Sequence, residues 1–264
     1  MSKTVEHLDE VTVRFAGDSG DGMQLIGTQF SDTSGFAGNE VNTFPDYPSE
    51  IRAPEGTLYG VSAFQVHFGT KNIKTTGDFI DVLVAMNASS LKVNLPNLRE
   101  HGIIIVNTGG FDEKNLKLAA FSSNPLENGS LEKYQVFAID MFDEIKKELD
   151  GLNLNPKLVK RTKNIFALGI VYWMFDRPIE PSVAWINKKF KGKEDIVLAN
   201  VKVLKAGWNF AEKNPLFKKQ YQIKKASLEP GRYRNITGNQ AVALGLVVAS
   251  RKANIPLFLG SYPI

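Results

Sequence analysis

The distribution of apolar and polar residues along the chain predicts strands that alternate with helices. Every second residue from Val11 to Phe15 is apolar, which is the period expected of a strand with one buried face. Residues 79–86 and 102–106 form nearly unbroken apolar runs, which are typical of strands buried on both faces of a parallel sheet. Similar patterns predict further strands at 40–44, 58–68 and 134–139.

Apolar residues spaced three or four positions apart predict helices between and after these strands. One helix begins at Met23, and another begins at Pro156, because proline fits the first turn of a helix. We predict the other helices from after residues 87–90 to about residue 99 and at about 141–149, 181–190 and 194–213. This order of elements indicates an α/β fold with a mainly parallel sheet flanked by helices.

The first predicted strand runs directly into a turn that contains Gly17, Gly20 and Gly22. A strand, a glycine turn and a helix N-terminus direct backbone N–H groups at one point, which suits an anionic ligand. Asp18 and Asp21 lie in the same turn, and their carboxylates repel phosphate. The residues leave two alternatives open, a ligand site or a tight connection with no ligand.

A proline-rich loop follows the second predicted strand, at residues 45–56. Proline removes a backbone donor and fixes φ, so this stretch is predicted to be irregular. Its side chains suit recognition, in particular Arg52, which can bind a carboxylate or phosphate in fork geometry. The structural alternative is a surface pair of Arg52 with Glu50 or Glu55, which contributes little.

Ligands of open parallel α/β sheets bind beyond the carboxyl ends of the strands. That rule brings the glycine turn, the 45–56 loop and residues 87–90 to one edge of the predicted sheet. Asn107 ends a predicted strand at the same edge and is a candidate ligand contact. Asn87 equally fits a helix cap, which is the more common role of such a residue.

The composition changes towards the end of the chain. Residues 214–230 mix lysine, proline, glutamine and serine without periodicity, and we predict a linker that separates residues 1–213 from residues 231–264. The last part reads as a turn, an alanine-rich helix and an apolar strand from residue 254. A single helix followed by a single strand is too short to bury its own apolar face, so this part of the chain resembles the start of a further domain.

Composition excludes several kinds of chemistry within this chain. It has 264 residues, of which 43% are hydrophobic and 23% charged, as in ordinary globular proteins. There is no cysteine, hence no disulfide, cysteine nucleophile or thiolate ligand for an iron–sulfur cluster. His7, His67 and His101 lack the spacing of metal ligands, and we predict neither a metal site nor a catalytic residue here.

Charge and hydropathy limit the partners and the location. The net charge of +4 is mild, and the lysines at 188–193 and 213–225 are interpreted as solvated surface, not as a nucleic-acid site. The longest apolar run, 165–175, is too short to span a membrane, and the start of the chain lacks the apolar core of a signal peptide. We therefore expect a cytoplasmic protein that binds neither nucleic acid nor membrane.

Five motifs together resemble one enzyme family. They are Gly-Asp-Ser-Gly-Asp-Gly-Met at 17–23, Tyr-Pro-Ser-Glu-Ile-Arg at 47–52, Arg-Thr-Lys-Asn-Ile-Phe-Ala-Leu-Gly at 161–169, Gly-Asn-Gln-Ala-Val-Ala-Leu-Gly at 238–245 and Tyr-Pro-Ile at 262–264. Nearly the whole chain resembles the alpha subunit of 2-oxoacid:ferredoxin oxidoreductases, particularly the 2-oxoglutarate type. The resemblance implies a gamma-type domain at 1–213, a linker at 214–230 and, at 231–264, the truncated start of a thiamine-enzyme (pyrimidine-type) domain.

The resemblance also implies an activity, the coenzyme-A-dependent oxidative decarboxylation of a 2-oxoacid with electrons passed to ferredoxin. Thiamine diphosphate, Mg and an iron–sulfur cluster would serve the complete complex, with the cluster on a beta subunit, in agreement with the lack of cysteine here. The piece alone is expected to be inactive. Implied contacts with coenzyme A or cofactor are Gly17, Gly20, Gly22, Glu50, Arg52, Asn107 and Tyr262.

Two functions of other classes stay open on the residues alone. One is a stand-alone module that binds a nucleotide or coenzyme A. The other is a structural interaction domain whose glycine turn holds no ligand.

Overall fold

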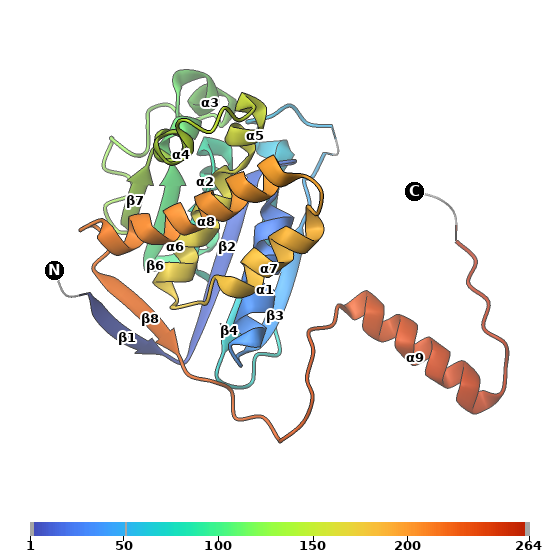
Figure 1. Cartoon of the computed structure of the whole chain (residues 1–264). Coiled ribbons are helices and arrows are strands. Elements are labelled where there is room, and N and C mark those ends of the chain that lie inside the picture. The colour runs from blue at the N-terminus through green and yellow to red at the C-terminus, as the bar shows by residue number, and fades with distance from the viewer. Residues whose placement is uncertain (1–2, 51, 262–264) are drawn as a thin grey trace. The chain divides into compact units, whose positions relative to one another are not determined.

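The computed structural model describes residues 3–50 and 52–261. The chain divides into two compact units, Met1–Ser227 and Leu228–Ile264, and each is described by itself. The first unit is an α/β domain (Figure 1). The described part of the second unit holds the helix α9.

The first unit is built around a sheet whose described strands lie in the order β3-β4-β2-β5-β6-β7. Their bounds are β2 (Glu10–Asp18), β3 (Glu40–Asp46), β4 (Val61–Gly69), β5 (Ile80–Ala85), β6 (Leu98–Asn107) and β7 (Gln135–Ile139). The neighbours β2, β5, β6 and β7 are parallel, whereas β4 runs antiparallel between β2 and β3. The predicted α/β fold with a mainly parallel sheet flanked by helices is confirmed, with β4 as the exception.

Helices cover both faces of this sheet. They are α1 (Met23–Phe36), α2 (Ala88–Asn94), α3 (Glu113–Leu118), α4 (Met141–Leu149), α5 (Pro156–Arg161), α6 (Lys163–Met174), α7 (Glu180–Lys189) and α8 (Glu194–Lys213). α1 and α6 share one apolar cluster with Val13 and Phe15 of β2, and α2 shares a second cluster with Leu83 of β5 on the opposite face. None of the helices in residues 3–50 and 52–261 is long and apolar enough to cross a bilayer.

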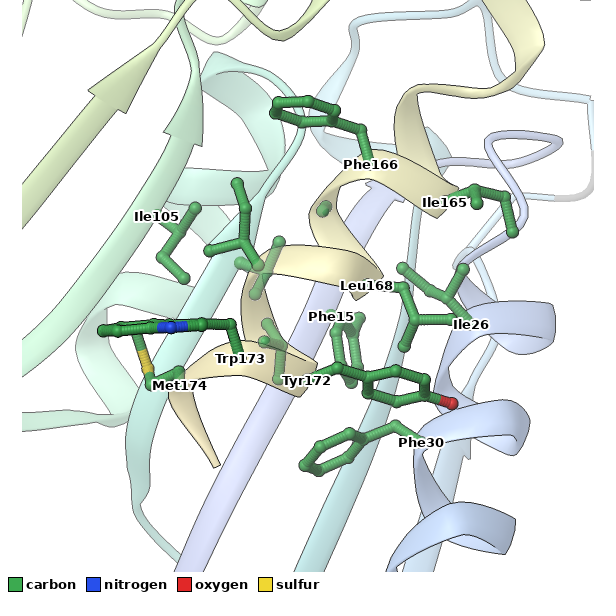
Figure 2. Packing of buried hydrophobic residues seen from close by; sticks show 14 of the residues in the cluster. Phe15, Ile26, Phe30, Ile105, Ile165, Phe166, Leu168, Tyr172, Trp173 and Met174 are labelled. Atoms are coloured by element: carbon green, nitrogen blue, oxygen red, sulfur yellow. The ribbon is translucent and has the colours of Figure 1, made fainter. Parts of the chain in front are cut away.

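Aromatic side chains fill the core between the sheet, α1 and α6 (Figure 2). The ring of Phe30 packs edge-on against Phe15, with 5.7 Å between the ring centroids, and against Phe68, with 5.2 Å. Tyr172 of α6 lies beside Phe30, and its hydroxyl is 2.7 Å from the hydroxyl of Ser182 in α7. These contacts join α1, α6 and α7 to the sheet.

The helices α6 and α8 cross with their backbones in contact. A Cβ on Gly169 of α6 would lie 3.0 Å from the Cα of Gly207 in α8 and 2.8 Å from the backbone nitrogen of Trp208. A Cβ on Gly207 would overlap the carbonyl oxygen of Phe166. Glycine is therefore required on both helices, and nearly all of α6 is buried between α8 and the sheet.

A small parallel sheet ties the beginning of the first unit to its end. Its strands are β1 (Thr4–Leu8) and β8 (Lys219–Ile223). Because β8 lies within residues 214–230, the structure differs there from the predicted linker. Phe217 is 1% exposed and stacks on Phe137, with 4.3 Å between the ring centroids, so this segment is part of the core. The first unit accordingly extends to Ser227 and not only to residue 213.

The second unit contains the predicted alanine-rich helix, α9 (Gly238–Ala253), which a capping box at Thr237 begins. Residues 254–261 form no strand, contrary to the prediction, because no other strand lies in the described part of this unit to pair with them. Apolar side chains are exposed along the unit, for example Val242 at 63% and Phe258 at 90%.

Candidate functional site

The carboxyl ends of β2, β5 and β6 meet at one edge of the sheet, where the glycine turn leads into α1. Two positions in the turn require glycine, because φ is 101° at Gly20 and 78° at Gly22, in the left-handed region. Gly22 is the N-cap of α1, and no side chain within the described residues forms a capping hydrogen bond there. The turn thus directs the N-terminus of α1 at this edge.

α6 brings Asn164 against the same turn. A Cβ on Gly22 would overlap the Nδ2 atom of Asn164. Asn164 is buried, with 7% of the residue exposed. The Oδ1 atom of Asn164 accepts a hydrogen bond of 2.8 Å from the backbone N–H of Ile165. Gly22 is therefore required both by its backbone angle and by its neighbour.

Asp18 ends β2 and holds a half-buried carboxylate at this edge. Its Oδ1 atom accepts a hydrogen bond of 3.1 Å from the backbone N–H of Gly56. Burial raises the pKa of the Asp18 carboxyl, and the nearby carboxylates of Asp21 and Glu55 add to the increase. Hydrogen bonds from Gly56 and from the side chain of Asn87 lower that pKa in part.

Asn107 lies at the carboxyl end of β6 and is 2% exposed. Its Nδ2 atom donates a hydrogen bond of 3.2 Å to the carbonyl oxygen of Met86, at the end of β5. Its Oδ1 atom is buried without a hydrogen-bond partner among the described residues. A Cβ on Gly110 would overlap the carbonyl oxygen of Met86 and the Cα of Asn87, so the chain passes closely here from the end of β6 to the end of β5.

Glu50 and Arg52 lie on the predicted loop, and both side chains are exposed. The backbone N–H of Glu50 donates a hydrogen bond of 3.3 Å to the carbonyl oxygen of Tyr59. No ion pair of Arg52 is found among the described residues, so the predicted alternative of a surface pair is not what the structure contains. Tyr262 lies outside the described residues.

The chemistry available at this edge is that of binding. Backbone N–H groups, amides and carboxylates converge there, and Arg52 supplies a cation on the adjoining loop. Within the described ranges, no three His, Asp or Glu side chains are arranged to hold a metal ion. The prediction that this chain holds no metal site or catalytic residue stays a prediction.

Comparison with known proteins identifies the family. The family model described as pyruvate ferredoxin/flavodoxin oxidoreductase matches residues 12–210. The chain belongs to this family. It is 47% identical over 259 residues to the 2-oxoglutarate oxidoreductase subunit KorA of Mycobacterium tuberculosis, a match that covers 98% of this chain and 40% of KorA.

Two solved structures of oxidoreductases share the fold. The 2-oxoglutarate:ferredoxin oxidoreductase of Magnetococcus marinus, solved with 2-oxoglutarate, coenzyme A and succinyl-CoA, matches with a TM-score of 0.70 at 22% identity over 92% of this chain and 38% of that one. The gamma subunit of a keto/oxoacid ferredoxin oxidoreductase from Geobacter sulfurreducens matches with a TM-score of 0.53 at 17% identity, over 76% of this chain and 96% of that one. The chain thus spans about two fifths of the length of KorA and of the M. marinus protein.

Within this oxidoreductase fold, the structure brings Gly17, Gly20, Gly22 and Asn107 to one sheet edge, as predicted. Their role in binding stays a prediction. Sequence reasoning did not single out Asn164 or the contact of Asp18 with Gly56. The motif at 161–169 was a signal for Asn164, but nothing local shows that α6 packs against the first turn.

Proposed function

We propose that this chain is part of a 2-oxoacid:ferredoxin oxidoreductase that acts on 2-oxoglutarate. Coenzyme A accepts the acyl group and ferredoxin accepts the electrons. The observation that carries the proposal is the 47% identity to KorA over 98% of the chain. Because the chain spans only 40% of KorA, the proposed reaction also needs the rest of such a protein and its partners.

The two units have different roles in this proposal. The first unit is a gamma-type domain, which is supported by its likeness to a gamma subunit over 96% of that subunit's length. The second unit is the start of the thiamine-enzyme domain. The exposed apolar side chains of α9 support this, because an isolated helix of this kind needs a further layer to cover it.

The cofactors belong mainly to other parts of the complex. Thiamine diphosphate, when bound, supplies the carbanion chemistry of decarboxylation. This chain has no cysteine to ligate an iron–sulfur cluster, so we assign the cluster to a beta subunit. We assign Mg, with thiamine diphosphate, to the complete complex. A stand-alone binding module and a purely structural domain are not favoured, because the family relationship covers the first unit nearly completely.

Within the complex, this chain binds coenzyme A at the carboxyl edge of its sheet. The exposed guanidinium of Arg52 suits a phosphate group of coenzyme A, since its five donors match phosphate oxygens in fork geometry. Glu50 lies on the same loop, and the turn glycines and Asn107 form the adjoining edge. The Asp18 carboxylate already accepts hydrogen bonds from the backbone N–H of Gly56 and from the side chain of Asn87, which limits its repulsion of an incoming phosphate.

The test uses the full-length protein that contains this sequence, expressed together with a candidate beta subunit. Reduction of a viologen dye is measured with 2-oxoglutarate and coenzyme A. We expect reduction that requires both substrates. A complex that reduces no dye with any common 2-oxoacid would contradict the proposal.

Replacing Arg52 by alanine is expected to raise the KM for coenzyme A about tenfold, because a charge-assisted hydrogen bond to phosphate is lost. The KM for the 2-oxoacid should change little. Arg99→Ala is the control, since Arg99 lies at the start of β6, away from the carboxyl edge, and pairs with Asp81 at 3.1 Å. Equal coenzyme A kinetics in the two variants would remove Arg52 from the site.

A further inference from the structure

One residue fastens the loop that carries Glu50 and Arg52 to the edge of the sheet. The backbone N–H of Gly56 is bound by Asp18, at 3.1 Å, and its carbonyl oxygen accepts a hydrogen bond from the hydroxyl of Ser89 in α2. Both backbone groups of Gly56 are therefore held by side chains of the sheet domain.

Side chains of α3 also lie close to the Cα of Gly56. A Cβ on Gly56 would lie 3.0 Å from Asn115 Oδ1 and 3.1 Å from Leu118 Cδ1, and φ is 82°. Asn115 and Leu118 belong to α3, so three separate elements meet at this glycine: the end of β2, the start of α2, and α3. A larger residue there is strained by the positive φ and requires the side chains of Asn115 and Leu118 to shift.

The side chains of the loop before Gly56 are largely exposed, and its backbone is held at Glu50 by the hydrogen bond to Tyr59. Tyr47 is 68% exposed, and Glu50, Arg52 and Glu55 are exposed as well. The fixed point nearest to Arg52 towards the C-terminus is therefore Gly56. The contacts that hold Gly56 therefore limit, together with the hydrogen bond of Glu50 to Tyr59, where the Arg52 side chain can reach.

We propose that Asp18 and Ser89 form a clamp on Gly56, and that this clamp positions the loop of Glu50 and Arg52 for coenzyme A. The inference rests on the proposed function, in which Arg52 contacts coenzyme A. Asp18 and Ser89 are positioning residues in this proposal, because they act through Gly56 and do not touch the substrate.

The charges around Asp18 support a dedicated role for its carboxylate. The charged side chains that act on Asp18 are those of Asp21 and Glu55, which carry the same charge. Among the described residues, Asp18 forms no ion pair. A carboxylate has two acceptor oxygens and no donor, which fits the two N–H donors that it meets, from Gly56 and from Asn87.

The test compares Asp18→Ala, Asp18→Asn and Ser89→Ala in the full-length chain, within its complex for kinetics. The first measurement is the rate of trypsin cleavage after Arg52, followed by fragment mass. We expect Asp18→Ala to raise it about tenfold. Asp18→Asn should fall between Asp18→Ala and wild type, since its amide oxygen still accepts from Gly56. Ser89→Ala serves if Asp18→Ala does not fold.

The second measurement is the split between KM and kcat. The KM for coenzyme A should rise from wild type to Asp18→Asn to Asp18→Ala, as the cleavage rate does. The kcat at saturating coenzyme A should stay unchanged. Asp143→Asn, a surface change in α4, is the control and should leave the cleavage rate unchanged.

Unchanged cleavage in both Asp18→Ala and Ser89→Ala would overturn the clamp. Faster cleavage with an unchanged KM would overturn its link to coenzyme A. A wild-type complex without coenzyme-A-dependent activity would refute the proposed function, while the cleavage rates would still decide the clamp.

Discussion

Replacing Phe30 by alanine is expected to lower the free energy of unfolding of the first unit by about 3–5 kcal/mol. Phe30 is 0% exposed, and its ring packs on Phe15 and Phe68 of the sheet as well as on Tyr172 of α6. Truncation removes the buried ring and leaves a cavity among aromatic neighbours that cannot all move inward. Urea denaturation followed by tryptophan fluorescence measures the change.

The same helix supplies the control. Phe36 ends α1 and is 77% exposed, so Phe36→Ala is expected to change the free energy of unfolding by less than about 0.5 kcal/mol. Similar losses in the two variants would show that α1 responds to the loss of any aromatic residue, and would contradict the role given to Phe30.

Gly207→Ala is expected to destabilise the first unit by about 2 kcal/mol or more, although alanine is the better helix former. Alanine gains up to about 1 kcal/mol over glycine in a helix interior. The new Cβ, however, overlaps the carbonyl oxygen of Phe166, a backbone atom that moves only if α6 moves. Overpacking of this kind typically costs about 1–3 kcal/mol, occasionally more, and it acts on the crossing of two buried helices. Thermal unfolding measures the loss.

Gly245→Ala is the matched control, a glycine-to-alanine change in a helix at a position where the new Cβ has space. Gly245 lies inside α9, and a Cβ there meets nothing within 4 Å. We expect this variant to leave the melting of the first unit unchanged. A Gly207→Ala protein that melts at the wild-type temperature would show that α6 and α8 can separate at little cost.

Local patterns predicted the helices best. The bounds 141–149 and 194–213 agree with α4 and α8, because apolar spacing and charged ends coincide there. The helix predicted to reach residue 99 ends instead at Asn94, and Pro96 lies in the short 3₁₀ turn that follows. Strand direction was not predictable, since the alternation in β4 is the same whether it pairs parallel or antiparallel.

The candidate site was predictable only where it is local. The turn at Gly20 and Gly22 follows from glycines after a strand, and both adopt positive φ. Asn164 and Gly56 reach the same edge through tertiary packing, which leaves no periodic trace in the sequence. Asn107 was expected at the edge, but its side chain bonds to the neighbouring strand, a detail that depends on how closely β5 and β6 end.

The pairing of β1 with β8 has a consequence for biosynthesis. Thr4 of β1 pairs with Lys219 of β8, which is made more than two hundred residues later. At translation rates of about 5–20 residues per second, β1 waits roughly 10–40 s with its backbone groups unpaired. The small sheet can therefore form only after β8 has been made, and a nascent chain stalled before residue 219 leaves the backbone groups of β1 without this partner.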